Sequence, residues 1–209
     1  MIRTLTNNRL FLVLCGVIDA MISAIYLAMQ AGGRTLTFHS WSGAVELQGK
    51  FALAAGICAI AAGVLRSESG KCWLLALHGL ALAALGVIQF GFVRFPVSLL
   101  SVSLLIIVMA VSIGALELEI GARLRRLQHA AGGWLLSAAG IASIGFALAF
   151  VALGFHWIRI EPGSYTDLLW LGAFFGFNAI GMLLLFVRLG GVTLSRLVPP
   201  AKLYNQLWL

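Results

Sequence analysis

Two ionisable side chains stand inside apolar stretches that are long enough to cross a bilayer. Asp19 lies near the middle of the first stretch, and His78 lies one to two helical turns inside the third. A charge at mid-bilayer is costly, so an ionisable residue there is a functional candidate by default. We expect Asp19 either to act as a proton-relay or cation-site carboxylate, or to lock helix packing through a hydrogen bond to a serine or a backbone carbonyl.

His78 has three possible roles. Imidazole can shuttle protons near neutral pH, and it can ligate haem iron. A bis-histidine haem needs a second histidine at similar depth, but the other histidines fall in predicted loops or at helix boundaries: His39, His129 and His156. We therefore expect a packed, neutral histidine and no cofactor or metal.

The remaining polar residues favour structural roles. Glu46 and Lys50 are four residues apart, in the favourable order for a helical ion pair. Residues 117–126 should continue the fourth helix into the cytoplasm, and Glu119 and Arg123 within them are again four apart. Gln89 and Asn178 could hydrogen-bond between helices. The HExxH, CxxC, G-x-S-x-G and Walker A motifs are all missing from the sequence, so we expect no enzyme.

The apolar composition predicts the transmembrane helices that carry these polar residues. Hydrophobic residues make up 61% of the 209 residues, charged residues only 10%, and the mean hydropathy is +1.03. A helix needs about 20 apolar residues to span a bilayer. The sequence therefore predicts an all-α integral membrane fold with six transmembrane helices: Leu10–Met29, Ala44–Leu65, Trp73–Val93, Val97–Leu116, Trp134–Leu153 and Leu168–Val187.

Basic residues next to the helix ends predict the orientation. Ten of the fourteen would lie on one side: Arg3, Arg9, Arg66, Lys71, Arg123, Arg125, Arg126, Arg188, Arg196 and Lys202. The other side would hold Arg34, Lys50, Arg94 and Arg159. The richer side should be cytoplasmic, with both termini. The polar stretches leave no room for a soluble domain, so the pI near 10.0 does not indicate nucleic-acid binding.

The helices form a threefold repeat. Trp73-Leu74-Leu75 with Gly79 recurs as Trp134-Leu135-Leu136 with Gly140, and more weakly as Leu10-Phe11-Leu12 with Gly16. This predicts three tandem hairpins, at about 8–66, 71–120 and 132–190, within a domain of residues 1–190. Trp73 and Trp134 would anchor the membrane boundary. Small residues would allow close helix packing, chiefly Gly16, Gly56, Gly63, Gly79, Gly140, Gly172 and Gly176.

The three hairpins, the Trp-Leu-Leu and glycine pattern, and Arg94-Phe95-Pro96 in a short outer turn resemble the HdeD-type acid-resistance membrane proteins. The resemblance covers most of residues 8–190. It implies a multi-pass protein of the bacterial inner membrane with a role in survival at low pH and high cell density. It carries over no catalytic or ligand residue. The long first outer loop, 30–43, and the tail beyond Arg188 depart from the family pattern.

The tail is the last candidate for a specific role. Pro199-Pro200 ends any helix, and residues 191–209 could lie in the membrane interface, anchored by Tyr204 and Trp208, or bind a partner. Two functions follow from the sequence. One is an HdeD-like role in stress or acid tolerance, by moving protons or a small solute or by supporting the membrane. The other is an accessory or assembly subunit, in contact with lipid and with other membrane subunits or a homo-oligomer.

Overall fold

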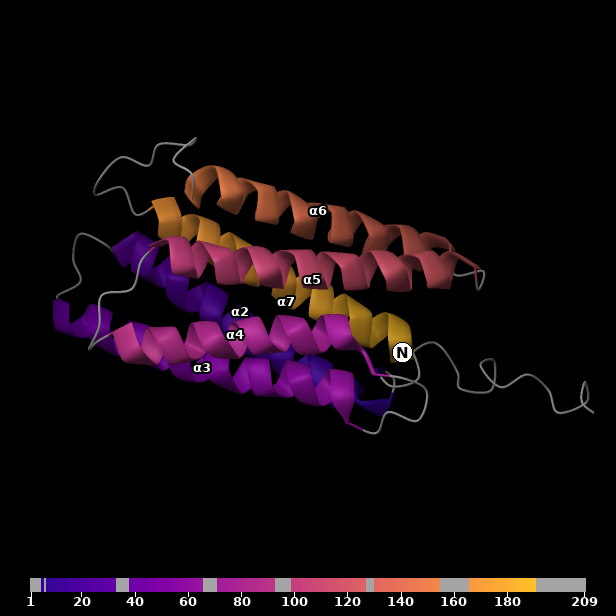
Figure 1. Ribbon diagram of the computed structural model, residues 1–209, viewed down its shortest axis with the longest axis horizontal. Coiled ribbons are helices and arrows are strands. Elements are labelled where there is room, and N and C mark those ends of the chain that lie inside the picture. Colours follow the sequence, from indigo (N-terminus) through magenta and orange to yellow (C-terminus); the bar gives the residue numbers. More distant parts are fainter. Residues whose placement is uncertain are drawn as a thin grey trace, which may run out of the picture.

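The computed structural model describes residues 5, 7–32, 38–65, 71–92, 99–126, 130–154 and 166–190. These residues contain six helices (Figure 1): α2 (Arg9–Gly32), α3 (Phe38–Val64), α4 (Trp73–Phe92), α5 (Leu99–Arg126), α6 (Ala130–Gly154) and α7 (Thr166–Gly190). All six are long and apolar enough to span a bilayer, which confirms the predicted all-α, six-helix membrane fold. The tail residues Tyr204 and Trp208 lie outside the described residues.

The helices form because a bilayer interior offers the backbone no water, so each segment must satisfy its own N–H and C=O groups. The C-terminal end of α3 is completed by two other segments. The buried Asn8 side chain donates from Nδ2 to the carbonyl oxygens of Ala62, at 3.1 Å, and Leu65. The backbone N–H of Cys72 donates to the Gly63 carbonyl at 2.8 Å. These bonds hold the start of α2 and the start of α4 against the end of α3.

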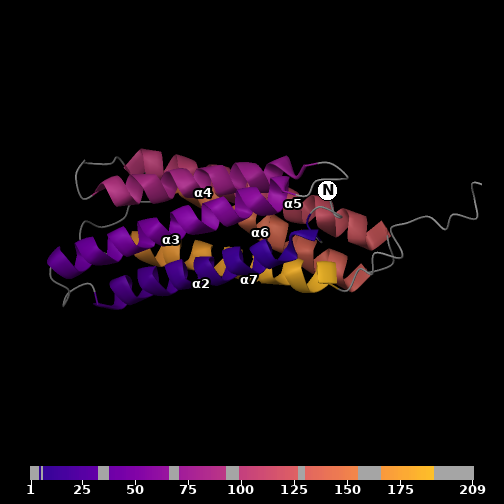
Figure 2. The ribbon, with the colours of Figure 1, turned by 90° about the horizontal axis from the view of Figure 1, so that it is seen from below.

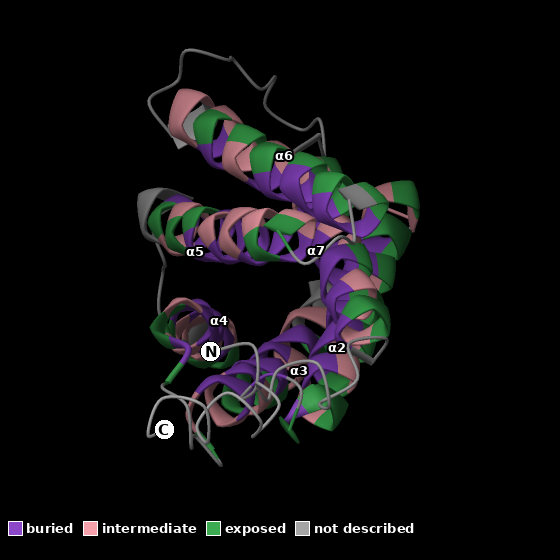
Figure 3. Ribbon diagram, turned by 90° about the vertical axis from the view of Figure 1, so that its right-hand side faces the viewer, coloured by how far each residue is buried: buried purple, intermediate pink, exposed green. Residues whose placement is uncertain are grey.

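The six helices lie side by side along the long axis of the molecule (Figures 1 and 2). Each helix contacts the next one in the chain, and α7 contacts α2, so the helices close into a ring. The end-on view shows this order, with α3 and α4 farthest from α6 (Figure 3). The ring gives the molecule an interior to which all six helices can contribute side chains.

Three helix pairs are packed most extensively: α3 with α4, α5 with α6, and α7 with α2. The equivalent glycines of the repeat sit in these pairs. A Cβ on Gly79 would lie 2.6 Å from the Gly56 carbonyl oxygen of α3, and one on Gly140 would lie 2.6 Å from the Gly114 carbonyl oxygen of α5. A Cβ on Gly16 would lie 3.3 Å from the Ala179 carbonyl oxygen of α7. The repeat therefore places a glycine at a close approach within each of the three most extensively packed helix pairs.

Two of the three predicted hairpins are confirmed, and the third, α6 with α7, is only weakly packed. Helices α2 and α3 pack together, as do α4 and α5, as two of the predicted hairpins require. Helix α6, however, contacts α5 far more than α7, and α7 runs along α2. The α5 helix also continues beyond the predicted span, from Leu116 to Arg126, which confirms that residues 117–126 are helical.

The outside of the ring is apolar. Buried positions face inward, and exposed positions lie mainly on the outer faces (Figure 3). The exposed side chains include large hydrophobic ones from every helix, among them Leu10, Ile57, Leu80, Val111, Leu148 and Ile180. Continuous apolar surface of this kind marks a membrane-contacting face.

Replacing Gly56 by alanine should destabilise the protein. The new Cβ would meet the Gly79 carbonyl oxygen and the Ala83 nitrogen at 2.6 Å, and both are backbone atoms that cannot rotate away. We expect a loss of about 1–3 kcal/mol in the free energy of unfolding, as for other overpacked sites. Gly145→Ala is the matched control, because a Cβ there meets nothing within 4 Å. Equal stability of the two variants in a denaturing-detergent titration would contradict the close approach.

Cys72 should be slow to alkylate in the folded protein. It is 1% exposed and precedes α4, and burial raises the pKa of its thiol above the ordinary value. A raised pKa leaves less thiolate at about pH 8 than a free cysteine has, and only the thiolate reacts. In a Cys15→Ala, Cys58→Ala variant, maleimide labelling should be slow, should rise with pH, and should accelerate on unfolding. Labelling as fast as that of the unfolded chain would show that Cys72 is open to water.

Candidate functional site

Asp19 occupies the inward-facing stripe of α2. The buried positions of this helix recur at three- and four-residue spacing: Leu12, Cys15, Gly16, Asp19, Ile22, Ser23, Tyr26 and Met29. This periodicity defines one face of a helix. Asp19 is 0% exposed, and α2 carries it into the interior of the ring.

Asn178 of α7 joins the two ionisable residues that the sequence singled out. Its Nδ2 donates to Asp19 Oδ2 at 2.5 Å and lies 3.4 Å from His78 Nε2. An amide nitrogen carries two hydrogens, one for each partner. Asn178 therefore forms a bridge between α2 and α4, and all three side chains are at most 2% exposed. The prediction that Asn178 hydrogen-bonds between helices is confirmed.

The other ring nitrogen of His78 sets its tautomer. Nδ1 lies 3.2 Å from the Met109 carbonyl oxygen of α5, which can only accept. Nδ1 therefore carries the proton of the neutral imidazole, and Nε2 is left as the acceptor for Asn178. The same carbonyl also accepts from Ser112 Oγ at 3.0 Å. The chain of contacts Asp19–Asn178–His78–Met109, here called the polar bridge, thus has one consistent set of donors and acceptors.

The polar bridge crosses the ring. Helices α7 and α4 are not neighbours in the ring, yet Asn178 and His78 meet in its interior. Cys15 brings in the fifth helix of the site, since its Sγ lies 4.0 Å from Asp19 Oδ2 and 3.7 Å from the Ala55 carbonyl oxygen of α3. The polar bridge and Cys15 together connect five helices.

Two oxygens of the polar bridge are left over. Asp19 Oδ1 and Asn178 Oδ1 are buried and have no hydrogen-bond partner among the described residues. Buried polar atoms are nearly always paired with protein or ordered water. Asn178 Oδ1 can only accept a hydrogen bond, whereas Asp19 Oδ1 accepts when the carboxyl is ionised and can donate when it is protonated.

A second buried carboxyl was missed from the sequence. Glu117 of α5 was expected in a helix continuing into the cytoplasm, but it is only 1% exposed. Ser143 Oγ of α6 donates to its Oε2 at 3.2 Å, whereas Oε1 lies against Gly181 of α7 and has no hydrogen-bond partner in the part of the chain that the structure describes. The signal was present in the spacing, because Glu117 falls on the stripe of buried residues Ile106, Met109, Ala110, Ile113, Leu116, Ile120 and Leu124.

Further polar contacts support the helix arrangement. Gln89 Nε2 donates to the Tyr26 hydroxyl at 2.5 Å, which confirms the predicted interhelical role of Gln89. Ser23 Oγ donates to the Gly172 carbonyl at 2.7 Å, between α2 and α7.

The predicted ion pair of Glu46 and Lys50 is present at 2.8 Å, and that of Glu119 and Arg123 at 2.6 Å. Both pairs are exposed, unlike the polar bridge.

Among the described residues, no group of three or more His, Cys, Asp or Glu side chains could hold a metal ion. Trp73 and Trp134 lie in the first two turns of their helices and are 68% and 64% exposed, so both rings are accessible for the predicted anchoring at the membrane boundary.

Comparisons with protein-family models, with curated proteins and with solved structures find no match. The fold and the polar bridge therefore identify a multi-pass membrane protein with a buried polar centre.

Removing the amide of Asn178 should uncouple the polar bridge. Asn178→Ala leaves Asp19 Oδ2 and His78 Nε2 without their donor, and we expect a loss of about 1–3 kcal/mol in unfolding free energy. Ser23→Ala removes an ordinary interhelical hydrogen bond and should cost about 0.6 kcal/mol.

A double-mutant cycle tests the coupling directly. Asp19→Ala and Asn178→Ala should be non-additive by at least about 0.5 kcal/mol in a denaturing-detergent titration, since their side chains touch. Additive losses would mean that the two side chains do not interact in the folded protein.

Proposed function

We propose that this chain is a non-enzymatic membrane protein that takes up and releases protons at the polar bridge, in the service of acid or stress tolerance. The observation that supports the proposal most directly is that Asn178 Nδ2 contacts both Asp19 Oδ2 and His78 Nε2 inside the ring. A carboxyl and an imidazole joined within the span of a bilayer are groups that membrane proteins use for proton relay. The resemblance to HdeD-type proteins suggests the physiological setting.

The hydrogen bonds of the polar bridge couple the protonation of its two ends. A proton placed on His78 Nε2 would face Asn178 Nδ2, a donor against a donor. The amide must then rotate and present Oδ1 to the imidazolium. That rotation also turns Oδ1 toward Asp19 Oδ2, which requires a proton on that carboxyl oxygen or its movement away. Proton uptake at His78 therefore drives a change at Asp19.

Glu117 supplies a third protonatable group nearby. Its carboxyl lies against Gly181, and Gly181 follows Asn178 by three residues, which is about one helical turn of α7. The direction from Asn178 to Gly181 leads toward the end of α7 that the basic residues predict to be cytoplasmic. We place Glu117 on the cytoplasmic side of the polar bridge, as the group that would exchange protons with it.

An accessory or assembly subunit is the alternative. It is favoured by the complete burial of Asp19 and His78, which are sealed among neighbouring helices as packing residues would be. In that case the apolar outer faces would contact other membrane subunits or further copies of the chain. For either function we place the protein in the bacterial inner membrane.

Proton flux into liposomes tests the proposal. The purified protein is reconstituted with a pH-sensitive dye inside, and a potassium diffusion potential drives protons inward. Wild type should acidify the interior faster than protein-free liposomes, and Asp19→Asn should remove that difference. Glu119→Gln makes the same carboxyl-to-amide change at an exposed site and should leave the flux unchanged.

Two results would overturn the proposed proton movement. Wild-type flux equal to that of protein-free liposomes, or an Asp19→Asn variant that folds and conducts as wild type does, would overturn proton movement through the polar bridge. Stoichiometric recovery with a larger membrane complex after gentle detergent extraction would then support the accessory role.

A further inference from the structure

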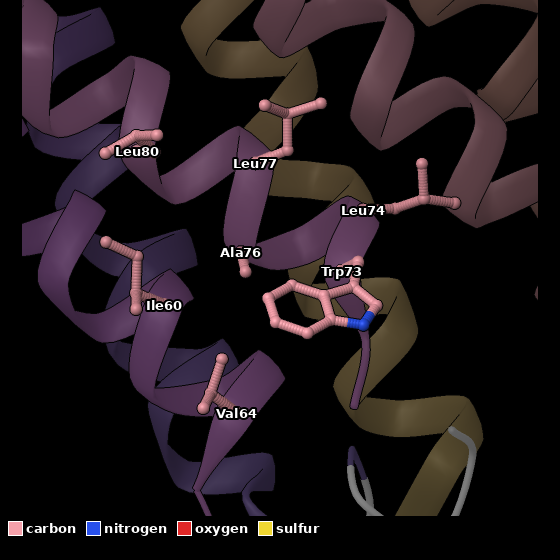
Figure 4. A pocket seen from close by; sticks show the side chains of 7 residues that line it. All are labelled: Ile60, Val64, Trp73, Leu74, Ala76, Leu77 and Leu80. Atoms are coloured by element: carbon pink, nitrogen blue, oxygen red, sulfur yellow. The ribbon is translucent and has the colours of Figure 1, made fainter. Parts of the chain in front are cut away.

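A groove runs along the outer face of α3 and α4. Its volume is about 500 Å³, and all its lining side chains are apolar (Figure 4). Ile60 and Val64 line it from α3, while Leu77 and Leu80 line it from α4. His78 is fully buried, whereas Leu77 and Leu80 are 47% and 60% exposed. The groove is thus separate from the polar bridge and open to whatever surrounds the ring.

One end of the groove carries an aromatic ring and a positive charge. Trp73, the first residue of α4, is 68% exposed and forms part of the lining. Lys71 Nζ lies 5.3 Å from the centre of the Trp73 ring. Indole rings favour the boundary between membrane and water, and lysine beside it can reach the headgroups. The groove therefore begins at the boundary between membrane and water, beside Lys71, and continues into the hydrocarbon.

We infer that this groove binds one anionic phospholipid, with an acyl chain along the apolar lining and its phosphate at Lys71. The length of the groove favours a lipid over a partner helix. From Trp73 to Leu80 the helix rises by about 10 Å, which fits within one leaflet, whereas a partner helix would cover the roughly 30 Å of the hydrocarbon core. The charge fits too, because a basic residue at the surface attracts anionic headgroups.

The repeat contains a matched site with the same charge and a different lining. The Arg125 guanidinium lies 4.4 Å from the ring centre of Trp134 in the first two turns of α6. The repeat aligns Leu77 with Ala138 and Leu80 with Ile141. The cation and the ring recur there, but alanine replaces one of the two leucines that would hold an acyl chain. Arg125 is therefore the control for charge alone.

Native mass spectrometry of the purified full-length chain tests the inference. The protein is titrated with phosphatidylglycerol or phosphatidylcholine in detergent, and bound lipids are counted. Wild type should hold one phosphatidylglycerol more tightly than phosphatidylcholine. Lys71→Gln should weaken that binding about fivefold, which corresponds to about 1 kcal/mol for one basic residue. Arg125→Gln should leave it unchanged, and soluble glycerol phosphate should not compete, because it lacks the acyl chain.

Fluorescence locates the bound chain. Brominated phosphatidylglycerol should quench wild type more than Trp73→Phe, and the quenching should saturate at one lipid per chain. Equal binding of the two lipids, equal loss in the Lys71 and Arg125 variants, or competition by glycerol phosphate would each overturn the inference. So would a copurifying membrane protein that blocks the quenching of Trp73, since the groove would then be a docking site for that protein.

Discussion

The structure depends on the close approach of helix backbones at glycine. Lipid tails are as apolar as leucine, so no hydrophobic gain pulls two helices together inside a bilayer, and packing must do so instead. The three equivalent glycines of the repeat contribute to that packing in three pairs: Gly79 against Gly56, Gly140 against Gly114, and Gly16 against Ala179. The third pair joins α7 to α2. Close packing at glycine therefore forms the helix pairs and also closes the ring.

Ring closure explains why polar residues can meet in the interior. Asp19, His78 and Asn178 come from three different helices, and each would face lipid at a cost if its helix stood alone. Within the ring, each becomes the hydrogen-bond partner of another. The interior is thus sheltered from lipid without being uniformly apolar, and the outer face keeps its charges close to the helix ends. The polar bridge lies in the interior of the ring, which is sheltered from lipid, and the groove lies on the outer face, which is exposed to lipid.

The sequence was sufficient for the fold, because six long apolar runs and the covalent order of the helices leave few alternatives. It was also sufficient to single out Asp19 and His78, since an ionisable residue inside an apolar run is conspicuous. It could not show that they meet through Asn178, because the rotation of each helix depends on packing with helices distant in the chain. Glu117 was missed for a related reason. Its charged neighbours suggested an exposed helix, and only the inward stripe of α5 separates Glu117 from the exposed Glu119. The orientation, the tail and the physiological role remain predictions.

The bond between Asp19 and Asn178 has a consequence for biosynthesis. The two residues are 159 positions apart, and of the six described helices α2 is the first to leave the ribosome and α7 is the last. At about 5–20 residues per second, roughly 10 to 30 s pass before the donor for this carboxyl has been made. During that interval the nascent chain carries an unpaired acid at the depth of the hydrocarbon. A chain that stops before α7 therefore leaves Asp19 without the amide of Asn178, at a depth where an unpaired charge is costly.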